Sequence, residues 1–170
     1  RPMFHPDFMG HGLAGKTIAI VGYGGIGMAL ARRAKAFDMT VLGVRRNPKR
    51  GGAHADEMHG PERLRAVLKR ADFVVLSVPM TAETDRLIDA HSIAAMKTGA
   101  FLVNIARGNL VVESALHAAL VSGKLGGYAA DVWWNYTNSF PATYHYPLVS
   151  RTGLHRLPNV ICGGGVAADI

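Results

Sequence analysis

Apolar residues follow two alternating patterns along the chain, and each pattern predicts a different element. Short runs rich in β-branched residues predict strands, whereas apolar residues that recur every three or four positions predict helices. The predicted strands cover residues 17–21, 40–44, 73–78, 101–105 and 159–162, and a short stretch at 127–130 leads into Asp131. The predicted helices cover residues 25–37, 60–71, 90–96 and 112–123. The stretch 133–156 has no clear period, and it is longer than an ordinary connection.

The helical pattern of residues 25–37 predicts an amphipathic helix. Ile26, Leu30 and Phe37 recur at helical spacing and define its apolar face. Arg32 and Lys35 fall on the opposite face. We therefore expect Ile26, Leu30 and Phe37 to pack toward the core.

The order of these elements predicts the fold class. Strands that are apolar nearly throughout and alternate with helices indicate a parallel sheet covered on both faces. Right-handed crossovers then favour an α/β, Rossmann-type, doubly wound parallel sheet with three α/β/α layers. We expect an N-terminal segment over residues 1–15, a dinucleotide-binding domain over 16–165 and a tail over 166–170.

Composition and charge restrict the candidate partners. The 170 residues carry 19 Lys and Arg against 12 Asp and Glu, a net charge of +7. The basic residues gather at 45–50 and 62–70 without interleaved aromatic residues, which favours a phosphate site over nucleic acid. No apolar run is long enough to span a membrane, and the first ten residues lack a signal-peptide core. The single cysteine, Cys162, fits a reducing cytoplasm and a buried strand position.

A glycine-rich turn lies between the first predicted strand and the first predicted helix. Gly22, Gly24 and Gly27 have G-x-G-x-x-G spacing, which is specific in this strand–turn–helix context. Gly22 permits the tight turn, Gly24 allows close approach of a pyrophosphate, and Gly27 lets the helix approach the strand. Backbone N–H groups around Gly25 and Ile26 would then face the anion.

Two arginines follow the second predicted strand. NAD-selective Rossmann folds place an acidic residue there, whereas this chain has Arg45 and Arg46. A guanidinium pairs bidentately with a 2′-phosphate and offers much less to a ribose diol. The sequence therefore favours NADP(H), with NAD(H) possible if these arginines are simply surface residues.

Four segments, taken together, resemble the nucleotide-binding domain of the D-isomer-specific 2-hydroxyacid dehydrogenases. They fall in order and at near-standard spacing between Leu13 and Val160: "GKTIAIVGYGGIG", "ADFVVLSVPMTAETDRLID", "MKTGAFLVNIARGNLVVESALHAALVSGKLGGYAADVW" and "LPNV". The resemblance implies an oxidoreductase that exchanges hydride between a nicotinamide cofactor and a small 2-keto or 2-hydroxy acid. It also implies a homodimer, and a substrate-binding domain that is absent from this chain.

The resemblance also implies roles for individual residues. Arg107 matches the arginine that holds the substrate carboxylate beside the nicotinamide, where a fixed cation also polarises the adjacent carbonyl. Arg45 stands where NAD-using members keep an aspartate. The remaining cofactor positions matched are Gly25 and Ile26 at the pyrophosphate, Val78, Pro79 and Thr84 beside the adenosine ribose, Ile105, Ala106 and Arg107 along the nicotinamide, and Asp131 at its carboxamide.

The pattern departs from the family at the acid/base residues. The family's closing "TPH" falls on Gly163, Gly164 and Gly165, so the histidine position carries glycine. The glutamate that orients this histidine is replaced by Tyr136. Three readings stay open: another donor from the long loop (Tyr136, His145 or His155), a non-catalytic dinucleotide-binding or sensor module, and divergence of the chain end.

Other candidate residues carry less chemistry. His54, Asp56 and His59 lie in a glycine-rich stretch without clear ligand spacing, so we expect a surface turn and no metal site. Trp133 and Trp134 are expected to line the cofactor cleft or a subunit contact.

Overall fold

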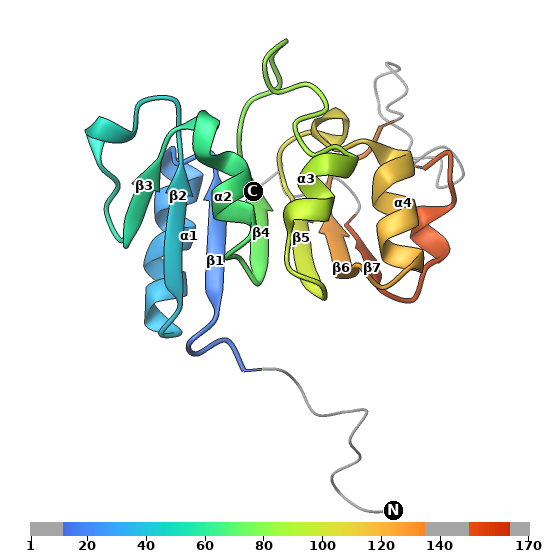
Figure 1. Ribbon diagram of the computed structural model, residues 1–170, viewed down its shortest axis with the longest axis horizontal. Helices are drawn as coiled ribbons and strands as arrows, with labels where there is room; N and C mark the ends of the chain where they lie inside the picture. The colour runs from blue at the N-terminus through green and yellow to red at the C-terminus, as the bar shows by residue number, and fades with distance from the viewer. Residues whose placement is uncertain (1–11, 135–149, 164–170) are drawn as a thin grey trace, which may run out of the picture.

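The computed structural model describes residues 12–134 and 150–163, which form one parallel sheet with helices on its faces (Figure 1). The strands are β1 (Thr17–Val21), β2 (Thr40–Val44), β3 (Glu57–His59), β4 (Phe73–Leu76), β5 (Ala100–Asn104), β6 (Leu125–Ala130) and β7 (Val160–Cys162). The α-helices are α1 (Gly25–Ala36), α2 (Leu64–Leu68), α3 (Ala90–Ala95) and α4 (Glu113–Val121). Short 3-10 helices are η2 (Pro48–Arg50), η3 (Pro61–Arg63), η4 (Gly108–Leu110) and η6 (Leu154–Arg156).

The strand order confirms the Rossmann-type prediction. The seven strands run β3-β2-β1-β4-β5-β6-β7, and every pairing is parallel. The direction of strand addition reverses between β1 and β4, which is where doubly wound sheets bind ligands. Val21 pairs with both Val44 and Leu76, so the carboxyl ends of β1, β2 and β4 lie at the same edge of the sheet.

Alternate residues of the central strands supply two separate cores. Ala19 and Val21 of β1 point to the side covered by α2, α3 and α4. Ile18 and Ile20 point to the other side, where they meet α1. Figure 1 shows this arrangement, with α2, α3 and α4 in front of the sheet and α1 behind it. β1 is therefore buried on both faces.

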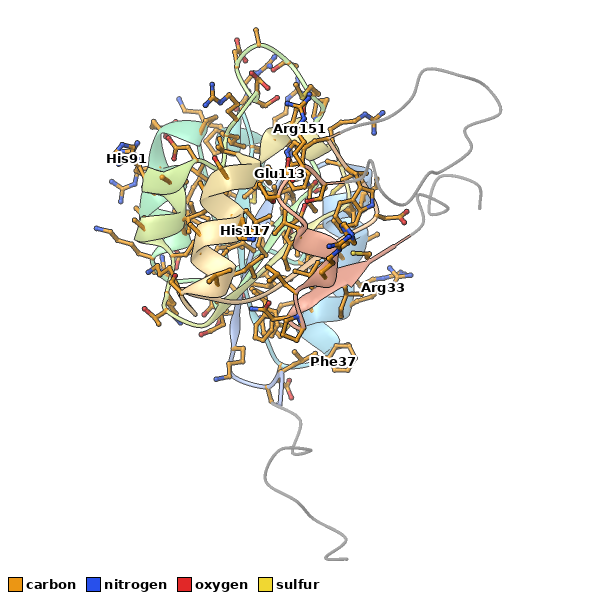
Figure 2. All side chains as sticks on the ribbon, turned by 90° about the vertical axis from the view of Figure 1, so that its right-hand side faces the viewer. Arg33, Phe37, His91, Glu113, His117 and Arg151 are labelled. Carbon is orange, nitrogen blue, oxygen red and sulfur yellow. The ribbon has the colours of Figure 1, made fainter. Side chains whose placement is uncertain are left out.

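The predicted apolar face of the first helix is confirmed at Leu30, which packs against the core, and is wrong at Ile26 and Phe37. Ile26 and Phe37 are 64% and 57% exposed, and Phe37 lies at the outer surface in Figure 2. The buried face of α1 is instead formed by Gly27, Ala31 and Ala34. Small residues occupy the buried face because α1 packs very close to the sheet. A Cβ at position 27, for example, would overlap the carbonyl oxygen of Gly22.

The helix cover of the sheet is uneven. Phe101 of β5 and Ile161 of β7 lie on the same face as α1, and they are 38% and 73% exposed. The expected cover on both faces is thus complete over β1 and incomplete over β5 and β7 within the described residues. None of the described helices combines the length and apolar character needed to cross a membrane.

Apart from shifts of one or two residues at the ends of elements, two local differences separate the observed elements from the predicted ones. β3 pairs with Leu42–Val44 of β2, although its Glu-Met-His sequence carries no apolar run. The helix predicted over residues 60–71 divides into η3, which begins at Pro61, and the shorter α2.

Candidate functional site

The turn after β1 requires glycine at its first position. Gly22 has a φ of +102°, a left-handed conformation that side chains other than hydrogen disfavour. A Cβ there would lie 2.5 Å from the carbonyl carbon of Ser77, which belongs to the backbone following β4. The Ser77 hydroxyl donates to the Gly22 carbonyl oxygen at 2.7 Å. Gly22 thus joins the ends of β1 and β4 at the switch point of the sheet.

Helix α1 begins at this turn with an open N-terminus. Gly24 is its N-cap residue and makes no side-chain cap, and the first turn of the helix carries no acidic residue. A Cβ at Gly24 or at Gly25 would meet nothing within 4 Å. The first backbone N–H groups of any α-helix lack partners inside the helix, so those from Gly25 onward can receive an anion.

A cavity of about 570 Å³ lies beside this turn, at the carboxyl ends of β1, β2 and β4. Its lining includes seven residues predicted from the sequence to bind the cofactor: Gly22, Gly24, Arg45, Arg46, Val78, Pro79 and Thr84. The other predicted cofactor residues are not among its lining residues: Gly25, Ile26, Gly27, Ile105, Ala106, Arg107 and Asp131. The structure therefore brings the glycine turn, the two arginines and the loop after β4 together around one cavity.

Tyr23 also lines the cavity, although it stands at a variable position of the glycine motif and was not predicted to do so. Its side chain is 2% exposed, and its hydroxyl donates to the carbonyl oxygen of Ala53 at 2.8 Å. A Cβ at Gly43 or Gly52 would collide with the Tyr23 ring. Burial raises the pKa of the Tyr23 hydroxyl, and the Asp56 carboxylate raises it further, so the hydroxyl stays a hydrogen-bond donor.

The two arginines after β2 have different partners. Arg45 is half-buried, and its Nη1 donates to the carbonyl oxygen of Gly51 at 3.1 Å. Arg46 is exposed, and its Nη2 lies 3.1 Å from Oε2 of Glu83. A carbonyl orients the Arg45 guanidinium without neutralising it, whereas the carboxylate of Glu83 offsets the charge of Arg46.

The loop after β4 is held by the hydroxyl of Thr84. This hydroxyl donates to the carbonyl oxygen of Pro79 at 2.8 Å and accepts from the backbone N–H of Thr81 at 2.8 Å. Asp85 closes the turn, since its N–H donates to the carbonyl oxygen of Thr81 at 2.9 Å. The position of Glu83 is thereby fixed by its own loop.

A second group of site residues follows β5, with Arg107 at its centre. The fully buried Asn104 donates through Nδ2 to the carbonyl oxygen of Arg107 at 2.8 Å. Its Oδ1 accepts from the N–H of Ala106 at 3.1 Å. Asn104 therefore holds the turn of Ile105, Ala106 and Arg107, and the exposed Arg107 side chain donates to the Ala106 carbonyl oxygen at 2.7 Å.

Sequence reasoning did not single out Asn104 or Ser77, although a signal for each is present. Both are single polar residues at the carboxyl end of an otherwise apolar strand. A buried polar side chain requires a partner, and at this edge of a parallel sheet the available partners are the site loops.

Asp131 follows β6, and Asn104 and Ala130 are paired across β5 and β6. The Arg107 turn and Asp131 are therefore neighbours along the same sheet edge. Gly163 follows β7, and its N–H donates to the carbonyl oxygen of Ala130 at 2.7 Å. A Cβ at position 163, where the family motif has threonine, would overlap Oδ1 of Asp131, so a side chain there would require the Asp131 carboxylate to turn aside.

Trp133 and Trp134 pack inward near this end of the sheet. The Trp133 indole N–H donates to the carbonyl oxygen of Gly163 at 3.2 Å, and the Trp134 indole N–H donates to that of Val111 at 2.7 Å. Both rings lie against Tyr128. Neither tryptophan lines the 570 Å³ cavity.

The alternative acid/base candidates lie mostly outside the described residues. Tyr136 and His145 fall in the parts of the chain that the structure does not describe. Gly164 and Gly165, at the proline and histidine positions of the family motif, lie there too. His155 lies in η6, ahead of β7, where it does not follow the carboxyl end of a strand.

The residues considered for a metal have structural partners. Asp56 accepts from the Val41 N–H at 2.7 Å and pairs with Lys35 at 2.9 Å. His59 bonds to Glu57 at 3.0 Å. Among residues 12–134 and 150–163 no group of three or more His, Cys, Asp or Glu side chains could hold a metal ion. Asp56 and His59 flank or lie in β3, so this stretch is an edge strand and not only a surface turn.

Cys162 lies in β7 and is half-buried. Its burial raises the pKa of the thiol, which keeps it protonated and unreactive at neutral pH.

Comparisons with known proteins agree with this arrangement. The profile of the family described as D-isomer specific 2-hydroxyacid dehydrogenase, NAD binding domain, matches residues 3–164. A glyoxylate reductase from Pyrococcus furiosus is 47% identical over 133 residues, which are 76% of this chain and 39% of that protein. The chain thus spans about two fifths of the length of this relative.

Solved structures share the fold. A glyoxylate reductase from Paecilomyes thermophila superposes with a TM-score of 0.74 at 33% identity, covering 93% of this chain and 44% of that one. An acyclic imino acid reductase in complex with NADPH and D-Arg superposes with a TM-score of 0.81 at 27% identity, covering 98% of this chain and 48% of that one.

Proposed function

The chain belongs to the D-isomer specific 2-hydroxyacid dehydrogenase family, and from that membership we propose that it transfers hydride between NADP(H) and a small 2-keto or 2-hydroxy acid. The observation that carries the proposal is the cavity at the carboxyl ends of β1, β2 and β4, which the glycine turn and two arginines line together. The similarity to glyoxylate reductases makes glyoxylate the first substrate to test, and the family resemblance adds hydroxypyruvate.

The residues around the cavity fit a dinucleotide. The open space at Gly24 and Gly25 leaves room for a pyrophosphate at the start of α1. Ile26 and Gly27 continue the same helical turn, where Ile26 presents its N–H and Gly27 keeps the helix close to β1. Val78, Pro79 and Thr84 would border the adenosine ribose from the opposite side of the cavity.

The preference for NADP(H) is supported by the charge after β2. Arg45 and Arg46 line the cavity where NAD-selective folds place an acidic residue. Two guanidinium groups favour the 2′-phosphate of NADP(H), and they gain nothing comparable from the ribose hydroxyl of NAD(H). The NADPH bound to the similar imino acid reductase supports the same assignment.

Calorimetric titration of NADPH and NADH tests this preference directly. We expect NADPH to bind more tightly, and Arg45→Asp to lower the affinity for NADPH by about tenfold to a hundredfold, because it removes a charge-assisted contact and adds a repulsive one. Arg33→Asp, a charge reversal on the exposed side of α1, is the matched control and should leave both affinities within about twofold. A preference for NADPH that persists undiminished in Arg45→Asp would refute the role of Arg45.

The substrate side of the proposal rests on the Arg107 turn. The nicotinamide, when bound, supplies or accepts the hydride. Arg107 would bind the carboxylate of the acid and polarise the neighbouring carbonyl, while Asn104 fixes the backbone of its turn from below. Ile105 and Ala106 would border the nicotinamide, and Asp131 would accept from its carboxamide.

A non-catalytic dinucleotide-binding or sensor module is the second candidate. It is favoured by glycine at the family's histidine position, Gly165, and by Tyr136 at the glutamate position. Loss of general acid–base help lowers rates by about 10²–10⁴-fold, while cofactor binding does not depend on it. Assays with glyoxylate or hydroxypyruvate and NADPH separate the two: tight NADPH binding without any turnover supports the module.

The proposal includes a homodimer in the cytoplasm. The dimer follows from the family resemblance, and a reducing compartment suits a single, half-buried cysteine. Sedimentation velocity of the purified chain measures the assembly state.

A further inference from the structure

Glu83 places a carboxylate in the cavity that the arginines otherwise make positive. It lines the same cavity as Arg45, Arg46 and Arg50, and its Oε2 lies 3.1 Å from Nη2 of Arg46. The pair spans from the end of β2 to the loop after β4, 37 residues apart in sequence. The ion pair therefore crosses the part of the cavity where the arginines would receive a 2′-phosphate.

The contacts and exposure of these residues show which side chains can exchange one binding partner for another. Arg45 is oriented by a backbone carbonyl and keeps its net charge. Glu83 is set in position by a loop that the Thr84 hydroxyl closes onto Pro79 and Thr81. The side chains of Arg46 and Glu83 are 80% and 76% exposed, so neither is held by packing. Both side chains can therefore leave the ion pair, and within residues 12–134 and 150–163 the carboxylate that Arg46 contacts is that of Glu83.

We propose that Glu83 is a specificity-determining residue that competes with the 2′-phosphate of NADP(H) for Arg46. In the free protein and with NAD(H), Arg46 stays on Glu83. With NADP(H), Arg46 exchanges the carboxylate for the phosphate, and the carboxylate is left near a second anion. Glu83 thereby lowers the affinity for NADP(H) and leaves the affinity for NAD(H) unchanged. It thus reduces the preference for NADP(H) over NAD(H) that Arg45 and Arg46 create. This inference rests on the proposed binding of a dinucleotide in this cavity.

The exposure of the pair limits the size of the effect. Exposed ion pairs contribute little because water screens them, and a phosphate dianion is the stronger partner for a guanidinium. Glu83 therefore modulates the preference and does not block NADP(H). The expected effect on affinity is about two- to fivefold, and it decreases as salt increases.

The test is the pair of dissociation constants for NADPH and NADH, measured by calorimetry in wild type and in Glu83→Gln. We expect Glu83→Gln to tighten NADPH binding by about two- to fivefold and to leave NADH binding within about 1.5-fold. A weaker NADPH affinity in Glu83→Gln would overturn the proposal, because it would mean that Glu83 positions Arg46 for the phosphate. An equal change for both cofactors, or no change, would overturn it as well.

Two further variants isolate the exchange at Arg46. Asp85→Asn removes a neighbouring negative charge from the same loop but lies outside the cavity lining, so it should leave the NADPH-to-NADH ratio unchanged. In an Arg46→Gln background, Glu83→Gln should no longer tighten NADPH binding. If it still does, or if Asp85→Asn has the same effect, Glu83 acts through general charge and not by competing for Arg46.

The outcome is distinguishable from failure of the proposed function. If wild type binds neither cofactor, the dinucleotide site itself is refuted. If wild type prefers NADPH and Glu83→Gln has the same ratio of NADPH to NADH affinity, only the role of Glu83 is refuted. A gain in NADPH affinity specific to Glu83→Gln supports the inference whichever cofactor wild type prefers.

Discussion

Gly27 and Gly25 belong to the same glycine motif but have different surroundings. A Cβ at position 27 would overlap the carbonyl oxygen of Gly22 and lie 3.1 Å from Cγ2 of Ile20. A Cβ at position 25 would meet nothing within 4 Å. The obstacle at position 27 is backbone, which cannot turn aside as a long side chain can. Gly27 therefore serves helix packing, and Gly25 serves the open N-terminus of α1.

Gly27→Ala should destabilise the protein although alanine is the better helix former. The clash with Gly22 and Ile20 would push α1 away from β1, and overpacking of this kind costs about 1–3 kcal/mol. Improved helix propensity offsets at most about 1 kcal/mol of that cost. Urea denaturation followed by circular dichroism measures the free energy of unfolding. NADPH affinity should fall as well, because the turn at Gly22 moves with the helix.

Gly25→Ala is the matched control for this substitution. Its added methyl group enters open space, so the free energy of unfolding should stay within about 1 kcal/mol of wild type or rise slightly. Equal destabilisation by both alanine substitutions would contradict the distinct packing role of Gly27.

The role of a residue was predictable where its neighbours in sequence determine that role. The spacing of Gly22, Gly24 and Gly27 predicted the turn, and the arginine pair after β2 predicted a positively charged cavity. The partner of Arg46 was not predictable, because Glu83 belongs to a distant loop whose fold decides where its carboxylate lies. The role of Asn104 was not predictable for a related reason. Its side chain makes two hydrogen bonds to the backbone of the Arg107 turn, and the hydrophobic pattern of the sequence does not show them.

At the level of elements, the sequence predicted the positions of strands better than the orientation of α1. Apolar β-branched runs mark buried strands without reference to a partner. The buried face of α1 depends on its partner, because close approach to the sheet selects Gly27, Ala31 and Ala34 over larger residues. Larger apolar residues at helical spacing, Ile26 and Phe37, remain at the surface as a result. Hydrophobicity alone cannot distinguish these two faces.

Charged contacts connect edge strand β3 to its neighbours. Glu57 receives two bonds from the Arg70 guanidinium, at 2.8 and 2.6 Å, and one contact from His59 at 3.0 Å. Arg70 follows α2, so this carboxylate connects the edge of the sheet to the helix layer. The Arg70 hydrogen bonds lower the pKa of Glu57 from 4.5 to about 2.

This lowered pKa predicts a specific dependence of stability on pH. Below pH 4.5 the unfolded chain binds a proton at Glu57 while the folded protein does not, until the pH approaches about 2. The contribution of Glu57 is therefore complete above pH 4.5 and is lost as the pH falls through about 2. Glu57→Gln should be less stable than wild type at pH 7, and the two should converge as the pH falls toward 2. Thermal unfolding at a series of pH values measures this.

Arg70→Met provides the reciprocal measurement. Removal of the guanidinium should bring the pKa of Glu57 back toward its ordinary value, as followed by NMR titration of the carboxyl carbon. A gap between wild type and Glu57→Gln that stays constant down to pH 2 would show that the carboxylate contributes through packing and not through its charge.

For the whole molecule, parallel strand order brings residues from distant sequence positions to one edge. The turn after β1, the arginines after β2, the loop after β4, the Arg107 turn after β5 and Asp131 after β6 all follow carboxyl ends of strands. Alternating strand and helix patterns predicted this edge correctly, because right-handed crossovers leave few other topologies. The incomplete cover over Phe101 and Ile161 was not predictable, since both residues lie in apolar runs like those of the covered strand β1.

The final strand depends on a contact that joins two distant parts of the chain. Oε1 of Glu113, at the start of α4, accepts from the Ser150 hydroxyl at 2.6 Å. The same oxygen accepts from the Thr152 N–H at 3.0 Å and from its hydroxyl at 3.1 Å. The buried Ser150 hydroxyl also accepts from the Leu154 N–H at 2.9 Å. One carboxylate oxygen therefore fixes the point from which the chain runs through η6 into β7.

Removing the Glu113 carboxylate should destabilise the β7 end of the sheet and leave the cavity at the carboxyl ends of β1, β2 and β4 intact. Glu113→Ala deletes three hydrogen bonds and leaves the buried Ser150 hydroxyl short of a partner, which should lower the free energy of unfolding by about 1–3 kcal/mol. Amides of residues 152–162 should exchange with deuterium faster, while those of β1 and β2 keep their protection until global unfolding. Glu113→Gln retains an acceptor oxygen of the same shape and should recover most of the protection. Faster exchange throughout the sheet would instead mean that the β7 end does not open separately from the rest of the fold.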